Sequence, residues 1–240
     1  MFIVEKDGAT FMNRKTVYSP HSFLLVVILS LVLILALVLL LIGAIGTAFA
    51  KVGFSSTTVA VILVATFLGS NVNIPILKLK TMMPVVKEEF VSFFGVVYRI
   101  PHVEYGERTT LIAINLGGAL IPTFISIYLL WKLPSAILYS AIGVLAVAVV
   151  THAVARPVRG VGIVTPAFIP PLVAALVAYI LPFNTPQVVA YVSGVLGTLL
   201  GADLSNLNII PKLGAPVASI GGAGTFDGVF LSGIIAALLA

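Results

Sequence analysis

The chain contains no cysteine, so disulfide bridges and thiolate metal sites are not available to it. Charge is also scarce: 9% of the 240 residues are charged and 60% are hydrophobic. No water-soluble domain of this length has such a composition, which excludes a sizeable domain outside the membrane. The long charge-free runs instead indicate an integral membrane protein whose solvent is the bilayer.

Clusters of His, Asp and Glu at metal-ligand spacing are missing too, so we expect no metal and no cofactor. The net charge of +5 and the pI near 9.6 do not predict a nucleic-acid partner. Lys and Arg concentrated in loops on one side of a membrane explain them better. The expected partners are the lipid bilayer and an unknown membrane peptide or small solute, and a homo-oligomer stays open.

The hydrophobic runs predict an all-α polytopic bundle of about seven spans, since each is long enough to cross roughly 30 Å of hydrocarbon. The first run is too long for a signal peptide and lacks a cleavage pattern. After a cytoplasmic segment at residues 1–22, one membrane domain covers residues 23–240. Its predicted spans are Phe23–Ala50, Ser55–Asn71, Thr109–Trp131, Ser135–His152, Gly162–Leu181, Pro186–Asp203 and Pro216–Ala240.

The basic residues orient these spans. A cytoplasmic N-terminus and an outside C-terminus leave only Lys51 and Lys132 outside. The cytoplasmic side then holds Lys6, Arg14, Lys15, Lys78, Lys80, Lys87, Arg99, Arg108, Arg156, Arg159 and Lys212.

The longest loop, residues 78–108, is therefore expected in the cytoplasm. Its centre, Phe90–Tyr98, is rich in aromatic and β-branched residues around Gly95. This composition predicts a small β-hairpin or an amphipathic interfacial segment. A packed loop that covers the cytoplasmic mouth of the bundle is the alternative.

Two similar segments suggest an internal repeat. Ser70-Asn71-Val72-Asn73-Ile74-Pro75 resembles Ser205-Asn206-Leu207-Asn208-Ile209-Ile210-Pro211, and a Gly-Gly-Ala follows each after a loop. The second and third spans would then be related to the sixth and seventh as parallel repeats.

Asp203 and Asp227 are the only acidic residues after Glu107, and both fall within predicted spans. An ionisable group in the hydrocarbon is costly and usually functional. Consecutive antiparallel spans pack side by side, so the two carboxyl groups are expected to meet and share a proton. Gly201, Gly224 and Gly228 would let backbone and water approach them. The structural alternative is that Asp203 caps a helix end while Asp227 pairs with Arg156 or Lys212.

Other polar residues are expected at the cytoplasmic ends of the spans, where they would bind a substrate or an ion. His152 is either a proton relay or metal ligand, or an ordinary interfacial residue. The remaining candidates are amides: Asn71, Asn73, Asn115, Asn206 and Asn208.

Four segments resemble an uncharacterised prokaryotic membrane-protein family, domain of unknown function 1614. They are Arg156–Gly162, Pro166–Pro171, Gly197–Leu204 and Leu213–Gly228. The resemblance covers most of the chain after about Phe23 and implies no activity.

Gly201-Ala202-Asp203 and Phe226-Asp227 also resemble, more weakly, the two motifs of presenilin and signal-peptide-peptidase intramembrane aspartyl proteases. Their order is reversed here, and the proline-alanine-leucine element has no counterpart after Asp227. The resemblance implies an intramembrane aspartyl hydrolase with Asp203 and Asp227 as catalytic acid and base. A proton-coupled transporter or channel that uses the same aspartates is the alternative.

Overall fold

The computed structural model describes residues 20–160, 162–222 and 228–240. Contacts divide the chain into two units, Met1–Gly43 and Ala44–Ala240, which are treated separately. The described part of the first unit belongs to helix α1, Pro20–Lys51. Phe23–Lys51 is strongly apolar, and its most hydrophobic stretch buries none of its side chains against protein. Such a helix requires an apolar surrounding, which a bilayer provides.

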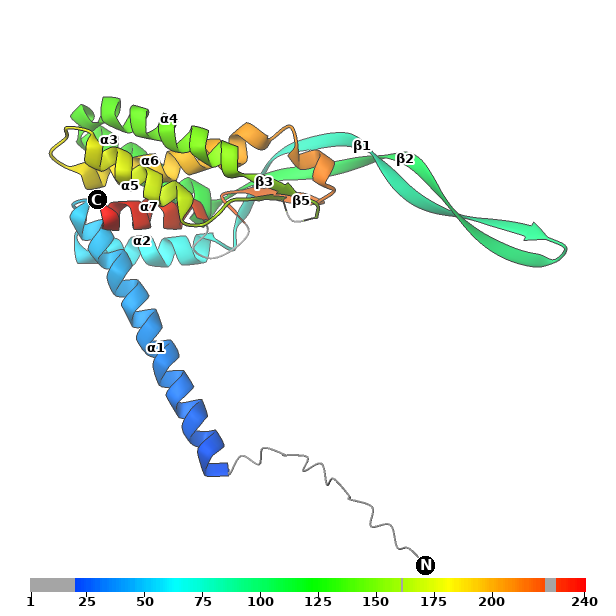
Figure 1. The fold of residues 1–240 in the computed structure, drawn as a ribbon, viewed down its shortest axis with the longest axis horizontal. Coiled ribbons are helices and arrows are strands. Elements are labelled where there is room, and N and C mark those ends of the chain that lie inside the picture. The colour runs from blue at the N-terminus through cyan, green and yellow to red at the C-terminus, as the bar shows by residue number, and fades with distance from the viewer. Residues whose placement is uncertain (1–19, 161, 223–227) are drawn as a thin grey trace, which may run out of the picture. The chain divides into compact units, whose positions relative to one another are not determined.

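The second unit is a helical bundle that continues at one end into a long β-hairpin (Figure 1). Its helices are α2 (Ser56–Gly69), α3 (Ile121–Lys132), α4 (Ile137–Val154), α5 (Ile169–Ile180), α6 (Pro186–Thr198) and α7 (Gly228–Leu239). Two π-helical turns occur at Leu116–Leu120 and Leu199–Asp203. Short 3₁₀ helices cover Pro134–Ala136, Leu204–Asn206 and Ile210–Leu213.

Helix α6 is the centre of the bundle and packs against α4, α5 and α7. Small residues permit these close crossings. A Cβ added at Gly197 would lie 2.5 Å from the Val147 Cβ, and one at Gly194 would lie 2.8 Å from the Ser232 carbonyl oxygen. Glycines at helix crossings let backbones approach, the usual basis of helix association in membranes.

The predicted all-α fold with about seven spans is wrong. Within the described residues, three helical segments are long and apolar enough to cross a membrane: Phe23–Lys51, Pro134–Val154 and Pro186–Asn206. The other apolar helices are shorter; α7, for example, has 12 residues, or about 18 Å of helix. The three long helices are compatible with a membrane protein.

Five strands in the described part also contradict an all-α fold. Strands β1 (Asn73–Phe93) and β2 (Val96–Asn115) are antiparallel, and β5 (Val217–Ile220) pairs in parallel with the end of β2. Strands β3 (Arg156–Val158) and β4 (Gly162–Val164) form a separate two-stranded sheet. The predicted spans that begin at Thr109, Gly162 and Pro216 therefore open as strands.

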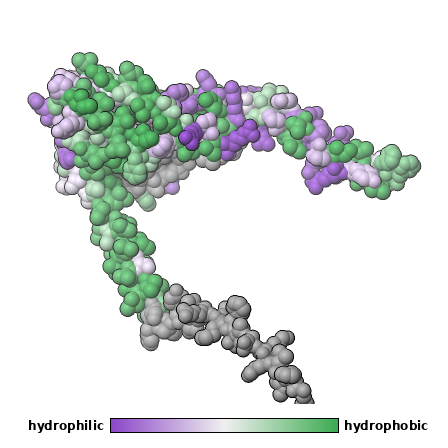
Figure 2. All heavy atoms as spheres, in the orientation of Figure 1, coloured by the Kyte–Doolittle hydropathy of each residue, from purple (hydrophilic) through white to green (hydrophobic). Residues whose placement is uncertain are grey.

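The β1–β2 hairpin is far longer than the small hairpin considered for residues 78–108. Its turn consists of Phe94 and Gly95, both with positive φ, as a two-residue hairpin turn requires. Apolar side chains at the tip are exposed, among them Phe90 and Phe94, while charged residues line the shaft (Figure 2). The shaft carries the cross-strand pairs Lys80–Glu107, Lys87–Glu104, Arg99–Glu88 and His102–Glu89, the last of which is ionic only when the imidazole is protonated.

Two of these ion pairs shift the pKa of one member each. A hydrogen bond from Lys87, followed by its charge, holds the pKa of Glu104 below its usual range. The carboxylate of Glu107 raises the pKa of Lys80 by the same two effects. The Lys87–Glu104 ion pair therefore stabilises the hairpin at pH values above the ordinary pKa of glutamate. This stabilisation is lost as the pH falls through the lowered pKa that Glu104 has in the folded protein.

Replacing Lys87 with Gln is expected to return the pKa of Glu104 to the ordinary glutamate value. Titration of labelled glutamate carboxyl carbons by NMR measures the shift. Lys78→Gln, which removes an exposed lysine outside the four ion pairs, should leave the pKa of Glu104 unchanged. An unchanged pKa in Lys87→Gln would contradict the pairing.

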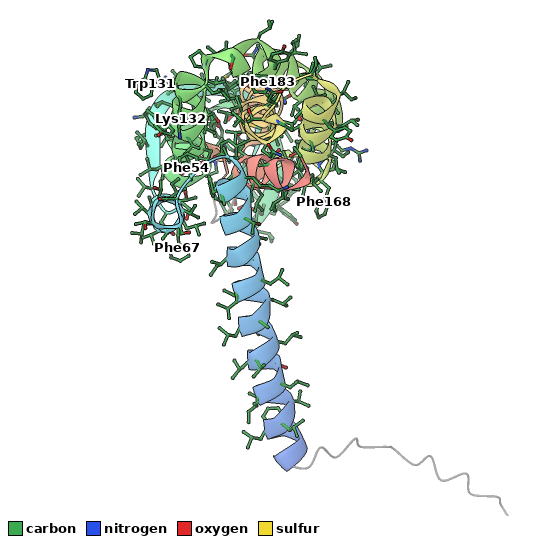
Figure 3. All side chains as sticks on the ribbon, turned by 90° about the vertical axis from the view of Figure 1, so that its left-hand side faces the viewer. Phe54, Phe67, Trp131, Lys132, Phe168 and Phe183 are labelled. Carbon is green, nitrogen blue, oxygen red and sulfur yellow. The ribbon has the colours of Figure 1, made fainter. Side chains whose placement is uncertain are left out.

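The end of the bundle away from the hairpin has the composition of a membrane interface. Figure 3 views this end and shows Trp131 and Lys132 at the periphery, where α3 ends. Trp131 is 77% exposed and lies beside Tyr128 with the two rings tilted by 46°, and the Lys51 ammonium donates to the Leu238 carbonyl. Tryptophan, tyrosine and lysine gather where hydrocarbon meets water.

Candidate functional site

A polar cavity of about 280 Å³ lies where the bundle meets the sheet. It is bounded by β4, the end of α6, the following π-helical turn, β5 and the start of α7. Its polar lining comes from Asn73, Thr165, Thr198, Asp203 and Ser219. Backbone at Gly162, Gly222 and Gly228 completes the wall.

Asp203 reaches this cavity because α6 does not end as a regular helix. Its last turn widens into the π-helical turn Leu199–Asp203, whose freed carbonyls are satisfied by nearby side chains. The Asn206 amide donates to the Ala202 oxygen at 2.8 Å, and the Ser205 hydroxyl donates to the Gly201 oxygen at 2.6 Å. Single π-helical turns of this kind are frequent at functional sites.

The Asp203 carboxylate is half-buried and fixed by backbone. Its Oδ2 accepts a hydrogen bond from the Gly221 N–H at 2.8 Å. Gly221 has φ +80°, and a Cβ there would lie 2.5 Å from the Ala119 Cβ. Only glycine fits this conformation and this close approach. The Gly221-Gly222 pair thus positions the carboxylate at the cavity wall.

Amides connect the cavity to the rest of the fold. The Asn73 Oδ1 accepts from the Ser219 hydroxyl at 2.5 Å and from the Asn115 Nδ2 at 3.1 Å. Asn115 is completely buried, and its Nδ2 also donates to the Ser70 oxygen. Its Oδ1 accepts from the Gly118 N–H, so it caps the π-helical turn Leu116–Leu120. The network ties α2, β1, β2 and β5 together.

The structure brings together Asp203, Asn73 and Gly228 of the predicted site, with Asn115 directly behind Asn73. Asp227 and Gly224 lie outside the described residues. The predicted meeting of the Asp203 and Asp227 carboxyl groups therefore also lies outside them. Gly222 and Gly228, which flank that segment, both line the cavity.

His152, Asn206 and Gly201 take positions around the same π-helical turn and are not part of the cavity lining. The exposed His152 has its Nδ1 2.8 Å from the Ser205 Oγ. Gly201 packs on α4, where a Cβ would lie 2.4 Å from the Ala148 oxygen. Asn206 is buried against the turn through its hydrogen bond to Ala202.

The remaining two amides are exposed. The Asn71 Nδ2 donates to the Phe67 oxygen at the end of α2, and Asn208 follows the 3₁₀ helix Leu204–Asn206.

Sequence reasoning missed Ser219, Thr165 and Thr198, because single hydroxyls in an apolar chain carry no motif. Ser219 had one usable signal, its position two residues before Gly221-Gly222. For a metal, the described residues offer no group of three or more His, Asp or Glu side chains. The chemistry available in this part of the chain is therefore that of one carboxylate, amides, hydroxyls and backbone.

Comparison with known proteins bears on the family alone. No curated protein and no solved structure matches the chain. These two comparisons therefore do not support the resemblance to intramembrane aspartyl proteases. A family model described as "Protein of unknown function (DUF1614)" matches residues 67–239, which include β1, β2 and all the helices from α3 to α7. The chain belongs to this family.

Proposed function

We propose that the protein is an intramembrane hydrolase of the aspartyl type, with Asp203 and Asp227 as its catalytic pair. One observation carries the proposal. The cavity holds the Asp203 carboxylate, and its wall includes Gly222 and Gly228, the two residues that flank the segment containing Asp227. A carboxylate kept among membrane helices calls for a functional explanation.

In the proposed reaction, one carboxylate takes a proton from a water molecule as the water oxygen attacks a peptide carbonyl carbon. The protonated partner carboxyl gives its proton to the amide nitrogen as the carbon–nitrogen bond breaks. The hydrogen bond from Gly221 fixes one Asp203 oxygen and so orients the carboxyl plane. The hydroxyl of Ser219 and the amide of Asn73 supply polar groups for the substrate backbone.

The packing beyond the cavity favours hydrolysis over a channel. Large side chains fill the middle of the described bundle, where Tyr191, Phe49 and Phe230 are completely buried. Tyr191 packs against Phe49 with ring centroids 5.8 Å apart. A site that opens at one end of a filled bundle suits a reaction with water from that side.

A proton-coupled transporter is the second candidate, because a π-helical turn lies at one end of α6 and another at the start of α3. Leu116–Leu120 leads into α3, and Leu199–Asp203 follows α6 and carries Asp203 into the cavity. Irregular helix ends in a membrane protein leave backbone groups that can bind an ion. The proposed internal repeat fits this candidate, since the strands before the two Gly-Gly-Ala segments, β2 and β5, pair in parallel.

Reconstituted vesicles separate the two candidates. The hydrolase predicts cleavage of membrane-spanning peptides, with loss of cleavage in Asp203→Asn and in Asp227→Asn. A proton-dependent flux without cleavage, lost in the same variants, would replace the hydrolase with the transporter. If the wild-type protein shows neither cleavage nor flux against a broad panel of peptides and solutes, both candidate functions are contradicted.

The proposed topology has the hairpin end in the cytoplasm and the C-terminus outside. The elements at the hairpin end carry most Lys and Arg residues of the second unit. Lys132, the last residue of α3, and Lys51, which binds the Leu238 carbonyl, lie at the other end. Because the chain has no cysteine, Ser92→Cys and Ser135→Cys report on the two ends separately. An impermeant maleimide applied to intact cells should label Ser135→Cys alone. Labelling of Ser92→Cys alone would reverse the topology.

A further inference from the structure

Arg159 and Lys212 line a second pocket, of about 350 Å³, against the middle of strand β1. Met82, Met83 and Pro84 of β1 form its other wall. Arg159 belongs to the turn between β3 and β4, and Lys212 to the 3₁₀ helix Ile210–Leu213. Three separate elements thus converge on a pocket with two cationic side chains and an apolar side.

The backbone holds the two cations beside each other. The Gly160 N–H donates to the Leu213 oxygen at 3.0 Å, and these residues directly follow Arg159 and Lys212. Gly214 then ends the 3₁₀ helix with φ +78°, and a Cβ there would lie 3.5 Å from the Met83 Cε. The pocket is therefore built by main-chain contacts and by packing on β1.

No carboxylate of the described residues balances the charge in this pocket. Neither Arg159 nor Lys212 forms an ion pair with the acidic residues in the described part of the chain. The four hairpin glutamates pair instead with Lys80, Lys87, Arg99 and His102. Two like charges beside one pocket repel each other, and an anion between them removes that cost.

The pocket lies close to the expected membrane surface. Helix α4, part of a candidate span, ends at Val154, and β3 begins two residues later at Arg156. The methionine and proline side chains offer an apolar wall, and methionine adapts its shape to a neighbouring chain. Basic pockets at this level of a membrane protein bind lipid head groups.

We propose that Arg159 and Lys212 bind the phosphate group of an anionic phospholipid, with Met82, Met83 and Pro84 against its apolar part. The site is separate from the Asp203 cavity and does not depend on the proposed hydrolysis.

The test uses the full-length protein in detergent, titrated with phosphatidylglycerol, phosphatidylcholine or inorganic phosphate. Phosphatidylglycerol is expected to raise the midpoint of thermal unfolding, and phosphatidylcholine is not. Each basic side chain near an anionic surface contributes about 5-fold to affinity. The double variant Arg159→Gln/Lys212→Gln should therefore bind phosphatidylglycerol about 25-fold more weakly and lose the rise.

Arg156→Gln is the matched control, because this arginine lies three residues away and outside the pocket lining. It should keep the full rise. Equal midpoints of the variants and the wild type in phosphatidylcholine establish that the variants fold. A rise that survives in the double variant would overturn the site. If inorganic phosphate raises the unfolding midpoint as much as phosphatidylglycerol does, the proposal that the bound phosphate group belongs to a lipid is overturned.

Discussion

Replacing Asp203 with Asn is expected to abolish peptide cleavage while leaving the protein folded. Positioned acids and bases contribute 10²–10⁴-fold to a rate, so we expect a loss of at least about 1,000-fold. The fold should survive, because the asparagine Oδ1 can still accept the Gly221 N–H that now binds Asp203. Cleavage of a labelled membrane peptide in vesicles measures the rate.

Glu107→Gln is the control for the loss of a negative charge. Glu107 lies on the hairpin shaft, where it pairs with Lys80 outside the cavity. This variant should cleave at the wild-type rate. Cleavage within about 10-fold of wild type in Asp203→Asn would remove Asp203 from the catalytic pair.

Replacing Asn115 with Ala should cause the largest loss of stability among the site residues. Three groups each lose a hydrogen bond to the Asn115 side chain: the Gly118 N–H, the Ser70 oxygen and the Asn73 Oδ1. A buried polar group without a partner costs about 1–3 kcal/mol, and at least two such groups result. The free energy of unfolding is therefore expected to fall by about 3 kcal/mol, measured by denaturant titration in detergent.

Asn208→Ala is the matched control because Asn208 is exposed. Its effect should stay within about 0.5 kcal/mol. A loss below about 1 kcal/mol in Asn115→Ala would show that the amide network does not hold α2 against the β2–β5 sheet.

Hydrophobicity alone predicted the long helices and failed at the strands. The run Phe23–Ala50 corresponds to α1, and Ser135–His152 overlaps α4, because a long charge-free segment has few alternatives. The run from Thr109 is equally free of charge, yet its first seven residues form the end of β2. A short apolar run does not distinguish a strand from a helix. Its residues pair with β1 on one side and, at Leu111–Ile114, with β5 on the other, and a run of hydrophobic residues does not reveal these partners.

A small hairpin was one of three alternatives for residues 78–108, beside an amphipathic interfacial segment and a packed loop, and the observed hairpin is far longer. Gly95 and the surrounding aromatic residues marked the turn correctly. The alternative of a packed loop over the cytoplasmic mouth fails, because the charged residues of the shaft form pairs across two strands, such as Lys80 with Glu107. Cross-strand pairing depends on register, which composition does not reveal.

The candidate site was predictable where polarity was rare. Asp203, Asn73 and Asn115 stood out as polar groups at the ends of apolar runs, and the structure places them near one another. Asn206 stood out equally, but it serves the backbone of its own turn. Its role depends on the π-helical turn Leu199–Asp203, whose widened geometry leaves carbonyls for side chains to satisfy.

The central claim, that Asp203 and Asp227 meet in one cavity, is tested most directly by disulfide cross-linking. The chain has no cysteine, so the double variant Asp203→Cys/Asp227→Cys contains one possible bridge. A disulfide requires Cα atoms about 4.4–6.8 Å apart. We expect mild oxidation to close this bridge in the membrane, as it should in the control Ser92→Cys/Val97→Cys, whose residues are direct partners across β1 and β2. Closure of the control bridge without closure of the Asp203→Cys/Asp227→Cys bridge would contradict the carboxylate pair.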